Sequence, residues 1–175
     1  MKNKEGWVQT DDGRKTTDDW MRSSTHMNNK ELLYWWRKTA GKFKQITEPA
    51  LDIDSVYEDV DACWTDVNND NKPDLIIASG GNEYYGTDSN LLPRVYLNDG
   101  RGNLIRKRDA FSNIYSTQSC ILPYDFNKDS KVDLFIGSRA VPFHYGDTPA
   151  SYLLMNDGTG KFKDVTNQYA KGLCD

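Results

Sequence analysis

The sequence predicts an all-β fold that is built from repeated units of about 60 residues. An Asp/Asn-rich motif occurs twice: DVNNDNKPDL begins at Asp66, and DFNKDSKVDL begins 59 residues later at Asp125. A second landmark repeats at nearly the same distance, as YLNDGRGNL (96–104) and LMNDGTGKF (154–162). Self-similarity at a fixed period of this length is typical of repeat architectures.

Each unit contains four short segments with the composition of β-strands. In the first unit they are VDACWT (60–65), LIIAS (75–79), RVYLN (94–98) and NLIRK (103–107). The continuous apolar run is typical of a strand that is buried on both faces. Asp-Gly followed by Gly predicts a hairpin between the last two strands, because these residues accept positive φ. The second unit repeats this order with CILPY, LFIGS, SYLLMN and KFKDV. Four short antiparallel strands per unit indicate the blades of a β-propeller.

The repeat also divides the chain. A fainter third copy, WWRKTAGKF, lies upstream, and NKELLYWWRK fits a degenerate strand better than a helix. We therefore expect a partial propeller with two complete blades and part of a preceding one. The predicted segments are a polar, disordered tail (1–28), the end of a preceding blade (29–58), two blades with acidic loops (59–110 and 111–170) and a C-terminal stub (171–175).

The Asp/Asn-rich loops have the chemistry of a calcium site. Ca²⁺ takes six to eight oxygen ligands, largely from carboxylates and carbonyls, and side chains at alternate loop positions can turn toward one centre. Positions 1, 3, 5 and 9 would supply side-chain oxygens and position 7 a backbone carbonyl. The expected ligands are Asp66, Asn68, Asp70, Lys72 and Asp74 in the first loop, and Asp125, Asn127, Asp129, Lys131 and Asp133 in the second.

Two other interpretations of these loops are less favoured. An EF-hand needs a bidentate Glu at position 12 between two helices, whereas that position holds Ile77 and Ile136 and strands flank both loops. A solvated polar turn would be natural for one copy. Two copies in register make it a weaker explanation than metal binding.

The D-x-[DN]-x-D-x-x-x-D-L loops, the period and the N-D-G-x-G hairpins resemble the FG-GAP/VCBS repeats of integrin-alpha-like β-propellers. Within that family the chain is most similar to VCBS-repeat proteins of bacterial cell envelopes. The resemblance implies about seven blades, calcium in the loop between the first two strands, and roles in adhesion, ligand binding or envelope assembly outside the cell. Such loops usually have Gly at position 6, which here holds Asn71 and Ser130, and too few blades are present to close a ring. The chain therefore looks like a fragment of a longer protein.

Composition narrows the other classes of function. The net charge of −4 provides no basic field for nucleic acid, and no apolar run approaches the length of a membrane helix. The first residues of the sequence as given lack the apolar segment that would predict a signal peptide. A Ser/His/Asp triad from His144, Asp147 and Ser151 lacks any nucleophile motif. We therefore expect a non-enzymatic interaction module. A propeller domain of a carbohydrate-active enzyme remains the alternative.

Aromatic residues follow equivalent strands in the two blades, in GGNEYYG and RAVPFHYG. They could stack on a glycan or peptide, although packing between blades is favoured, since aromatics serve packing more often. The candidate ligand-binding residues are Tyr84, Tyr85, Arg139, His144 and Tyr145. We also expect apolar blade faces at the ends of the stack, and therefore self-association.

Overall fold

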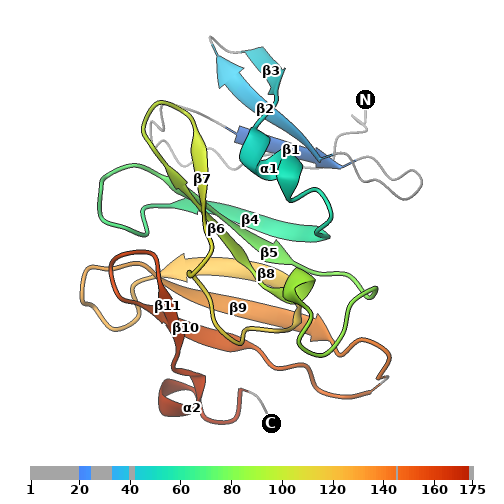
Figure 1. The fold of residues 1–175 in the computed structure, drawn as a ribbon. Helices are drawn as coiled ribbons and strands as arrows, with labels where there is room; N and C mark the ends of the chain where they lie inside the picture. Colours follow the sequence, from blue (N-terminus) through green and yellow to red (C-terminus); the bar gives the residue numbers. More distant parts are fainter. Residues whose placement is uncertain (1–19, 25–32, 40–41, 145, 174–175) are drawn as a thin grey trace, which may run out of the picture. The chain divides into compact units, whose positions relative to one another are not determined.

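A computed structural model describes residues 20–24, 33–39, 42–144 and 146–173 of the chain (Figure 1). The chain divides into two compact units, residues 1–55 and 56–175. No helix within the described ranges is long and apolar enough to cross a membrane.

The first unit contains a three-stranded antiparallel sheet in the order β1-β2-β3 and one short helix. Its elements are β1 (Trp20–Ser24), β2 (Leu33–Thr39), β3 (Lys42–Ile46) and α1 (Pro49–Ile53). Strand β2 confirms the strand predicted for residues 29–38 over residues 33–38, and residues 29–32 lie outside the described residues. Strand β1 lies inside residues 1–28, where the sequence pattern indicated a tail without regular structure.

The second unit begins with a four-stranded antiparallel sheet, the first blade, in the order β4-β5-β6-β7. Its strands are β4 (Asp59–Thr65), β5 (Asp74–Ser79), β6 (Arg94–Asn98) and β7 (Leu104–Lys107). All six residues of β5 are buried, as its unbroken apolar run predicts. A short 3₁₀ turn, η1 (Ser89–Leu91), lies in the long connection before β6.

The second blade has the same design, in the order β8-β9-β10-β11. Its strands are β8 (Thr117–Tyr124), β9 (Asp133–Ala140), β10 (Tyr152–Asn156) and β11 (Phe162–Asp164), and helix α2 (Thr166–Tyr169) follows. The predicted all-β class and the two four-stranded blades are thus confirmed.

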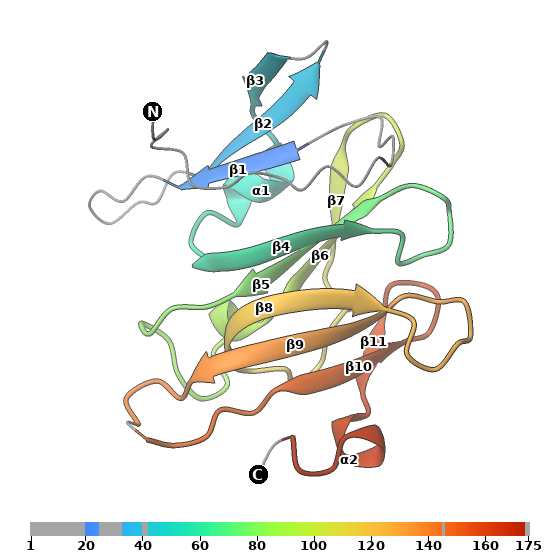
Figure 2. The ribbon, with the colours of Figure 1, turned by 180° about the vertical axis from the view of Figure 1, so that it is seen from behind.

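The two blades stack on each other, with β8 beside β4 and β5 (Figure 2). Side chains alternate between the faces of a strand, so each blade turns one set of apolar residues toward the other. The resulting core contains Ile76, Ala78, Val95, Ile121, Ile136, Leu154 and other buried side chains. Burying one such aliphatic side chain contributes about 1.5–3 kcal/mol.

Two polar side chains, the half-buried Asp61 and the buried Gln118, also connect the blades. The Asp61 carboxylate accepts a hydrogen bond from the Ile121 N–H at 2.9 Å. The Gln118 side chain accepts from the Ser79 N–H and donates to the Leu91 carbonyl, both at 2.9 Å. The register of β8 shifts between Gln118 and Cys120, which removes this segment from the regular ladder. The Gln118 side chain thus satisfies two backbone groups of the first blade, and the Asp61 side chain satisfies one backbone group of the second.

Candidate metal-binding loops

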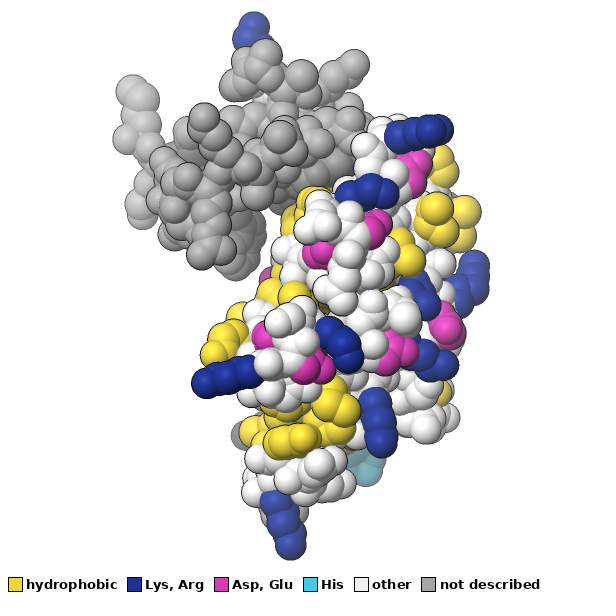
Figure 3. All heavy atoms as spheres, turned by 90° about the vertical axis from the view of Figure 1, so that its left-hand side faces the viewer, with side chains coloured by type: hydrophobic (Ala, Val, Ile, Leu, Met, Phe, Trp, Pro, Cys, Tyr) yellow, Lys and Arg dark blue, Asp and Glu magenta, His cyan; other side chains and the backbone are white. Residues whose placement is uncertain are grey.

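The two Asp/Asn-rich loops lie at the same end of the second unit, because each connects the first and second strands of its blade (Figure 1). Acidic and basic side chains alternate on this end of the molecule (Figure 3). The repeat therefore places both predicted ligand sets in equivalent positions of neighbouring blades.

In the first loop, side-chain oxygens organise the backbone. The Asp66 carboxylate accepts hydrogen bonds from the N–H groups of Asp70 at 3.2 Å and Asn71 at 2.7 Å. Asn68 Oδ1 also accepts from the Asp70 N–H, and Asp70 Oδ1 accepts from the Lys72 N–H at 2.9 Å. The side chains at positions 1, 3 and 5 thus fix the turn of the loop by accepting hydrogen bonds from its backbone N–H groups.

The second loop repeats these bonds. Asp125 accepts from the N–H groups of Asp129 at 3.1 Å and Ser130 at 2.9 Å. Asn127 Oδ1 accepts from the Asp129 N–H, and Asp129 Oδ1 accepts from the Lys131 N–H, both at 3.0 Å. The two loops therefore share one local conformation as well as one motif.

Both loops also use left-handed backbone at the same two positions. Position 6 has φ of 61° at Asn71 and 67° at Ser130, in agreement with the Gly that such loops usually carry there. Position 4 has φ of 61° at Asn69 and 62° at Lys128, which the motif did not reveal. Asn accepts this conformation readily, whereas Ser and Lys adopt it at a cost.

The Asp at position 9 fastens each loop to its blade. Asp74 is completely buried, and its two oxygens accept from the N–H groups of Val67 at 3.0 Å and Asn98 at 2.8 Å. Asp133 is equally buried and accepts from the Asn156 N–H at 2.8 Å. Its Oδ2 atom is buried without a hydrogen bond, although the Phe126 N–H is close enough to affect the pKa of the carboxyl.

These carboxylates influence one another electrostatically. Burial raises the pKa of Asp74, and the charges of Asp70 and Asp66 raise it further, while the N–H groups of Asn98 and Val67 oppose the shift. The pKa of Asp133 is also raised, first by burial and then by Asp129 and Asp125. In both loops, a cation near the three carboxylates would favour their charged forms.

A lysine at position 7 supplies positive charge in each loop. Lys72 Nζ lies 3.5 Å from Asp70 Oδ2, and Lys131 Nζ lies 3.4 Å from Asp129 Oδ2. Lys72 also donates to the carbonyl of Asp99 in the following hairpin. In this conformation each ammonium group partly neutralises the carboxylate at position 5.

The donor set fits a hard cation, but its conformation is not that of a closed cage. Each loop offers three carboxylates, one amide oxygen and a backbone carbonyl, which suit Ca²⁺. Among the described residues, no three His, Cys, Asp or Glu side chains are grouped so that they could hold a metal ion as they stand. A bound cation would therefore have to draw the carboxylates together and displace the lysine ammonium group.

One part of each loop's surroundings escaped the sequence analysis. Asn98 and Asn156, the residues before Asp-Gly in the hairpins, each bind the Asp at position 9 through their N–H groups. Their side-chain amides then donate to the carbonyls of Pro73 and Val132 at 3.0 and 2.9 Å. The sequence signal for this role is the recurrence of Asn before Asp-Gly in both units.

The predicted aromatic residues lie on the connections after β5 and β9. Tyr85 and Phe143 are 68% and 75% exposed, and their rings meet edge to face with centroids 5.6 Å apart. Tyr84 and Tyr85 line a shallow hollow of about 500 Å³ together with Glu83, Gly86, Thr87 and Asp88. The contact joins the two blades, while both rings remain open to solvent.

Two other candidates for ligand binding, His144 and Arg139, have no ring contact with this pair among the described residues. His144 Nδ1 lies 3.4 Å from Asp147 Oδ2, and both side chains are exposed. Arg139 is exposed near the end of β9, and Tyr145 lies outside the described residues. Phe143, which the sequence analysis did not select, occupies a turn closed by the His144 N–H and the Val141 carbonyl at 3.1 Å.

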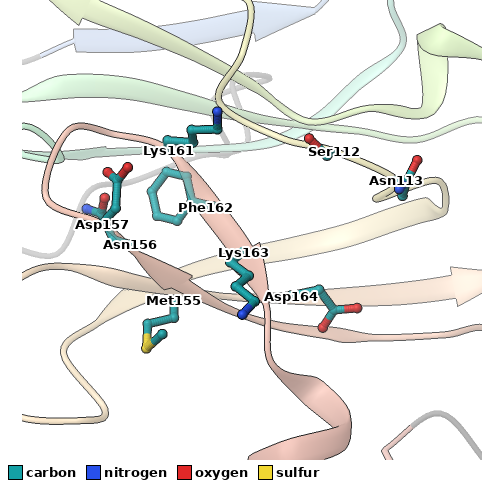
Figure 4. A pocket seen from close by; sticks show the side chains of 9 residues that line it. All are labelled: Ser112, Asn113, Met155, Asn156, Asp157, Lys161, Phe162, Lys163 and Asp164. Atoms are coloured by element: carbon teal, nitrogen blue, oxygen red, sulfur yellow. The ribbon is translucent and has the colours of Figure 1, made fainter.

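A second hollow, of about 620 Å³, lies along the outer strand β11 (Figure 4). Its lining combines Lys161, Lys163, Asp157 and Asp164 with Phe162, Met155 and three uncharged polar residues. Met155 and Lys163 are paired in register and project to one side of the sheet, and Phe162 projects to the other. Because this lining mixes charged, polar and apolar side chains, it does not indicate a particular class of ligand.

Stacked four-stranded blades with acidic loops between their first two strands define a repeat module of the β-propeller type. The comparison with protein families indicates which kind of repeat this is. Residues 66–136, a stretch that includes both acidic loops, match the family model described as FG-GAP-like repeat. No curated protein and no solved structure matched the chain.

Proposed function

We propose that this protein is a calcium-binding, non-enzymatic propeller module that acts outside the cell or in the cell envelope, in adhesion or scaffolding. The observation that supports calcium binding is the identity of the two loops. Their hydrogen bonds and their left-handed positions correspond residue by residue at a distance of 59 positions. A cation would offset the repulsion among the three carboxylates, which recur in the same arrangement in both loops.

Each loop would hold the cation through the side chains at positions 1, 3, 5 and 9 and the carbonyl at position 7. The cation would offset the like charges around Asp74 and Asp133, whose raised pKa values reflect burial and neighbouring carboxylates. Affinities near those of extracellular calcium modules, about 10⁻⁴–10⁻³ M, are expected.

Isothermal titration calorimetry with CaCl₂ tests this proposal. Two binding events are expected for the parent, and one each for Asp70→Asn and Asp129→Asn, because each substitution removes a carboxylate from one loop only. Asp109→Asn is the matched control, since Asp109 is an exposed carboxylate outside the loops that pairs with Lys107 at 3.0 Å. A parent without calcium heat at any temperature, and without calcium-dependent change in its melting, would contradict calcium binding.

For the interaction itself, we propose that Tyr85 and Phe143 form the contact surface for a protein or glycan ligand. Phe143 has a φ of 62° in its turn, where Gly or Asn would be relaxed, so its ring is kept there at a conformational cost. Both rings are exposed, so packing alone does not explain that cost.

The variant Phe143→Gly separates ligand binding from structure. It is expected to leave the melting temperature unchanged or slightly higher, because Gly relieves the strained turn. It should also weaken binding to glycan or peptide arrays, and Tyr85→Ala should weaken the same interactions. If array binding by the parent is unaffected by both substitutions, the ligand surface lies elsewhere.

A further inference from the structure

The lysine at position 7 of each acidic loop is held in the same way in both blades. In the first loop, the ammonium group of Lys72 lies 3.5 Å from the Asp70 carboxylate. In the second loop, that of Lys131 lies 3.4 Å from the Asp129 carboxylate. A single ion pair on the surface would carry little weight, since many such pairs contribute nothing measurable. The recurrence of this pair at the same position of both loops makes it a feature of the repeat.

The hairpin that follows in each blade accommodates the lysine side chain. A Cβ added to Gly100 would lie 2.8 Å from Lys72 Cε. A Cβ added to Gly158 would lie 3.0 Å from Lys131 Cδ. The aliphatic stem of each lysine therefore lies across the glycine of the Asp-Gly turn, where a methyl group would crowd it. In the first blade, the ammonium group also donates to the carbonyl of Asp99 at 3.2 Å, so packing and hydrogen bonding both fix its position.

We propose that Lys72 and Lys131 compete with calcium for the acidic loops, so that each lysine stabilises its loop without the cation and lowers its affinity for the cation. This inference rests on the calcium binding proposed above and concerns how that binding is regulated. The ammonium group neutralises the carboxylate at position 5, which is one of the proposed ligands. Because a divalent cation repels an ammonium group, the lysine side chain leaves when the cation binds.

The competition has opposite effects on the two forms of a loop. Without calcium, the ammonium group offsets one of three like charges and stabilises the fold. With calcium, the same interaction has to be broken, so the apparent affinity falls. The side chains of Lys72 and Asp70 are 41% and 32% exposed, and solvent therefore keeps both effects modest. A neutral side chain at position 7 should strengthen calcium binding and weaken the calcium-free fold, a combination that a purely structural lysine would not give.

The variants Lys72→Met and Lys131→Met test the competition. Met reaches as far as the Cε atom of Lys, so it keeps the packing over the hairpin glycine, and it retains the backbone carbonyl at position 7. Isothermal titration calorimetry with CaCl₂ should show binding about threefold to tenfold tighter at the altered loop, with the other loop unchanged. In excess chelator, the melting temperature of each variant should be about 1–3 °C below that of the parent.

Acetylation of the parent by an N-hydroxysuccinimide ester, followed by peptide mass spectrometry, measures the displacement of the ammonium groups directly. Lys72 and Lys131 should react faster in CaCl₂ than in excess chelator, because the carboxylates no longer hold their ammonium groups. Lys107 is the matched control, since its ammonium group lies 3.0 Å from Asp109, also two positions away, but outside the acidic loops. Its rate should not depend on calcium, and Lys107→Met should leave both calcium affinities unchanged.

The outcomes separate this inference from the proposed function. If the parent binds calcium and both Met variants bind it with the parental affinity, the competition is refuted and the proposed function stands. Equal tightening by Lys107→Met would assign the effect to net charge and also refute the competition, as would labelling rates of Lys72 and Lys131 that calcium does not change. A parent without any calcium heat would overturn the proposed function and this inference together.

Discussion

The side-chain amide of Asn156, in the second blade, donates a hydrogen bond of 2.9 Å to the backbone carbonyl of Val67, in the acidic loop of the first blade. The same amide group donates to the Val132 carbonyl in its own blade. Gly160, four residues further on, approaches Val67 so closely that an added Cβ would lie 2.9 Å from Val67 Cγ2. The hairpin of one blade thus supports the acidic loop of the other.

This relationship predicts a difference between two equivalent residues. Asn156→Ala leaves the buried Val67 carbonyl without its partner and removes the bonds from the Gly158 and Gly160 N–H groups. Asn98→Ala removes the bonds to the Pro73 carbonyl and from the Gly100 N–H, both within its own blade. The free energy of unfolding should fall by about 2–4 kcal/mol for Asn156→Ala and by about 1 kcal/mol for Asn98→Ala. Urea unfolding measures both, and equal losses would show that the contact between the blades adds nothing.

The left-handed backbone at position 6 of the second loop leads us to expect that Gly would stabilise the protein there. Ser130 has a φ of 67°, and its N–H binds the Asp125 carboxylate, a bond that Gly retains. Ser130→Gly should raise the free energy of unfolding by about 0.5–1 kcal/mol, because Gly adopts this backbone without a steric penalty. Asn71→Gly, at the matching position of the first loop, should be nearly neutral since Asn tolerates it. Thermal melting of the three proteins decides the matter, and a lower melting temperature for Ser130→Gly would refute the explanation.

Calcium should stabilise the folded chain. If each loop binds with the affinity expected above, 5 mM CaCl₂ contributes about 1–2 kcal/mol per loop relative to excess chelator. The melting temperature should therefore rise with CaCl₂, and less so in Asp70→Asn and in Asp129→Asn. MgCl₂ at the same concentration serves as the control, because Mg²⁺ sheds its water reluctantly and should have a smaller effect. Coincident melting curves with and without calcium would rule out a stabilising role.

The sequence predicts the strands of the second unit closely because two local patterns coincide there. RVYLN is β6 residue for residue, and the unbroken apolar run LIIAS falls within β5 (Asp74–Ser79). The positive φ of Asn71 and Ser130 could also be anticipated, since the loop motif requires a sharp turn at that position. Where periodicity, turn residues and the register of the repeat agree, the local sequence is sufficient to predict the position of a strand and the conformation of a loop.

The features that escaped prediction depend on contacts across long stretches of chain. Asn156 reaches Val67 across 89 positions, and Gln118 reaches Ser79 across 39, so neither bond has a local signature. Strand β1 (Trp20–Ser24) was missed because its pattern is polar and its pairing with β2 is not encoded locally. Phe143 was overlooked because a bulky residue is an unusual choice for a left-handed position.

The thiol of Cys63 predicts how stability changes in alkaline solution. Burial, with a contribution from the charge of Asp61, raises the pKa of Cys63 from 9.0 to about 12. Between these values the unfolded thiol loses its proton while the folded thiol keeps it. The unfolded state then binds fewer protons, so the free energy of unfolding falls as pH rises through this window.

Cys63→Ala isolates that effect from the titration of Tyr and Lys residues, which also occurs above pH 9. The substitution should cost some stability at pH 7, because it removes the sulfur of a partly buried side chain that packs against the core between the blades. Its stability should then decline less steeply than that of the parent between pH 9 and pH 11. Urea unfolding at pH 7, 9, 10 and 11 gives the two slopes, and parallel slopes would mean that the Cys63 thiol ionises as easily in the folded protein as in the unfolded chain.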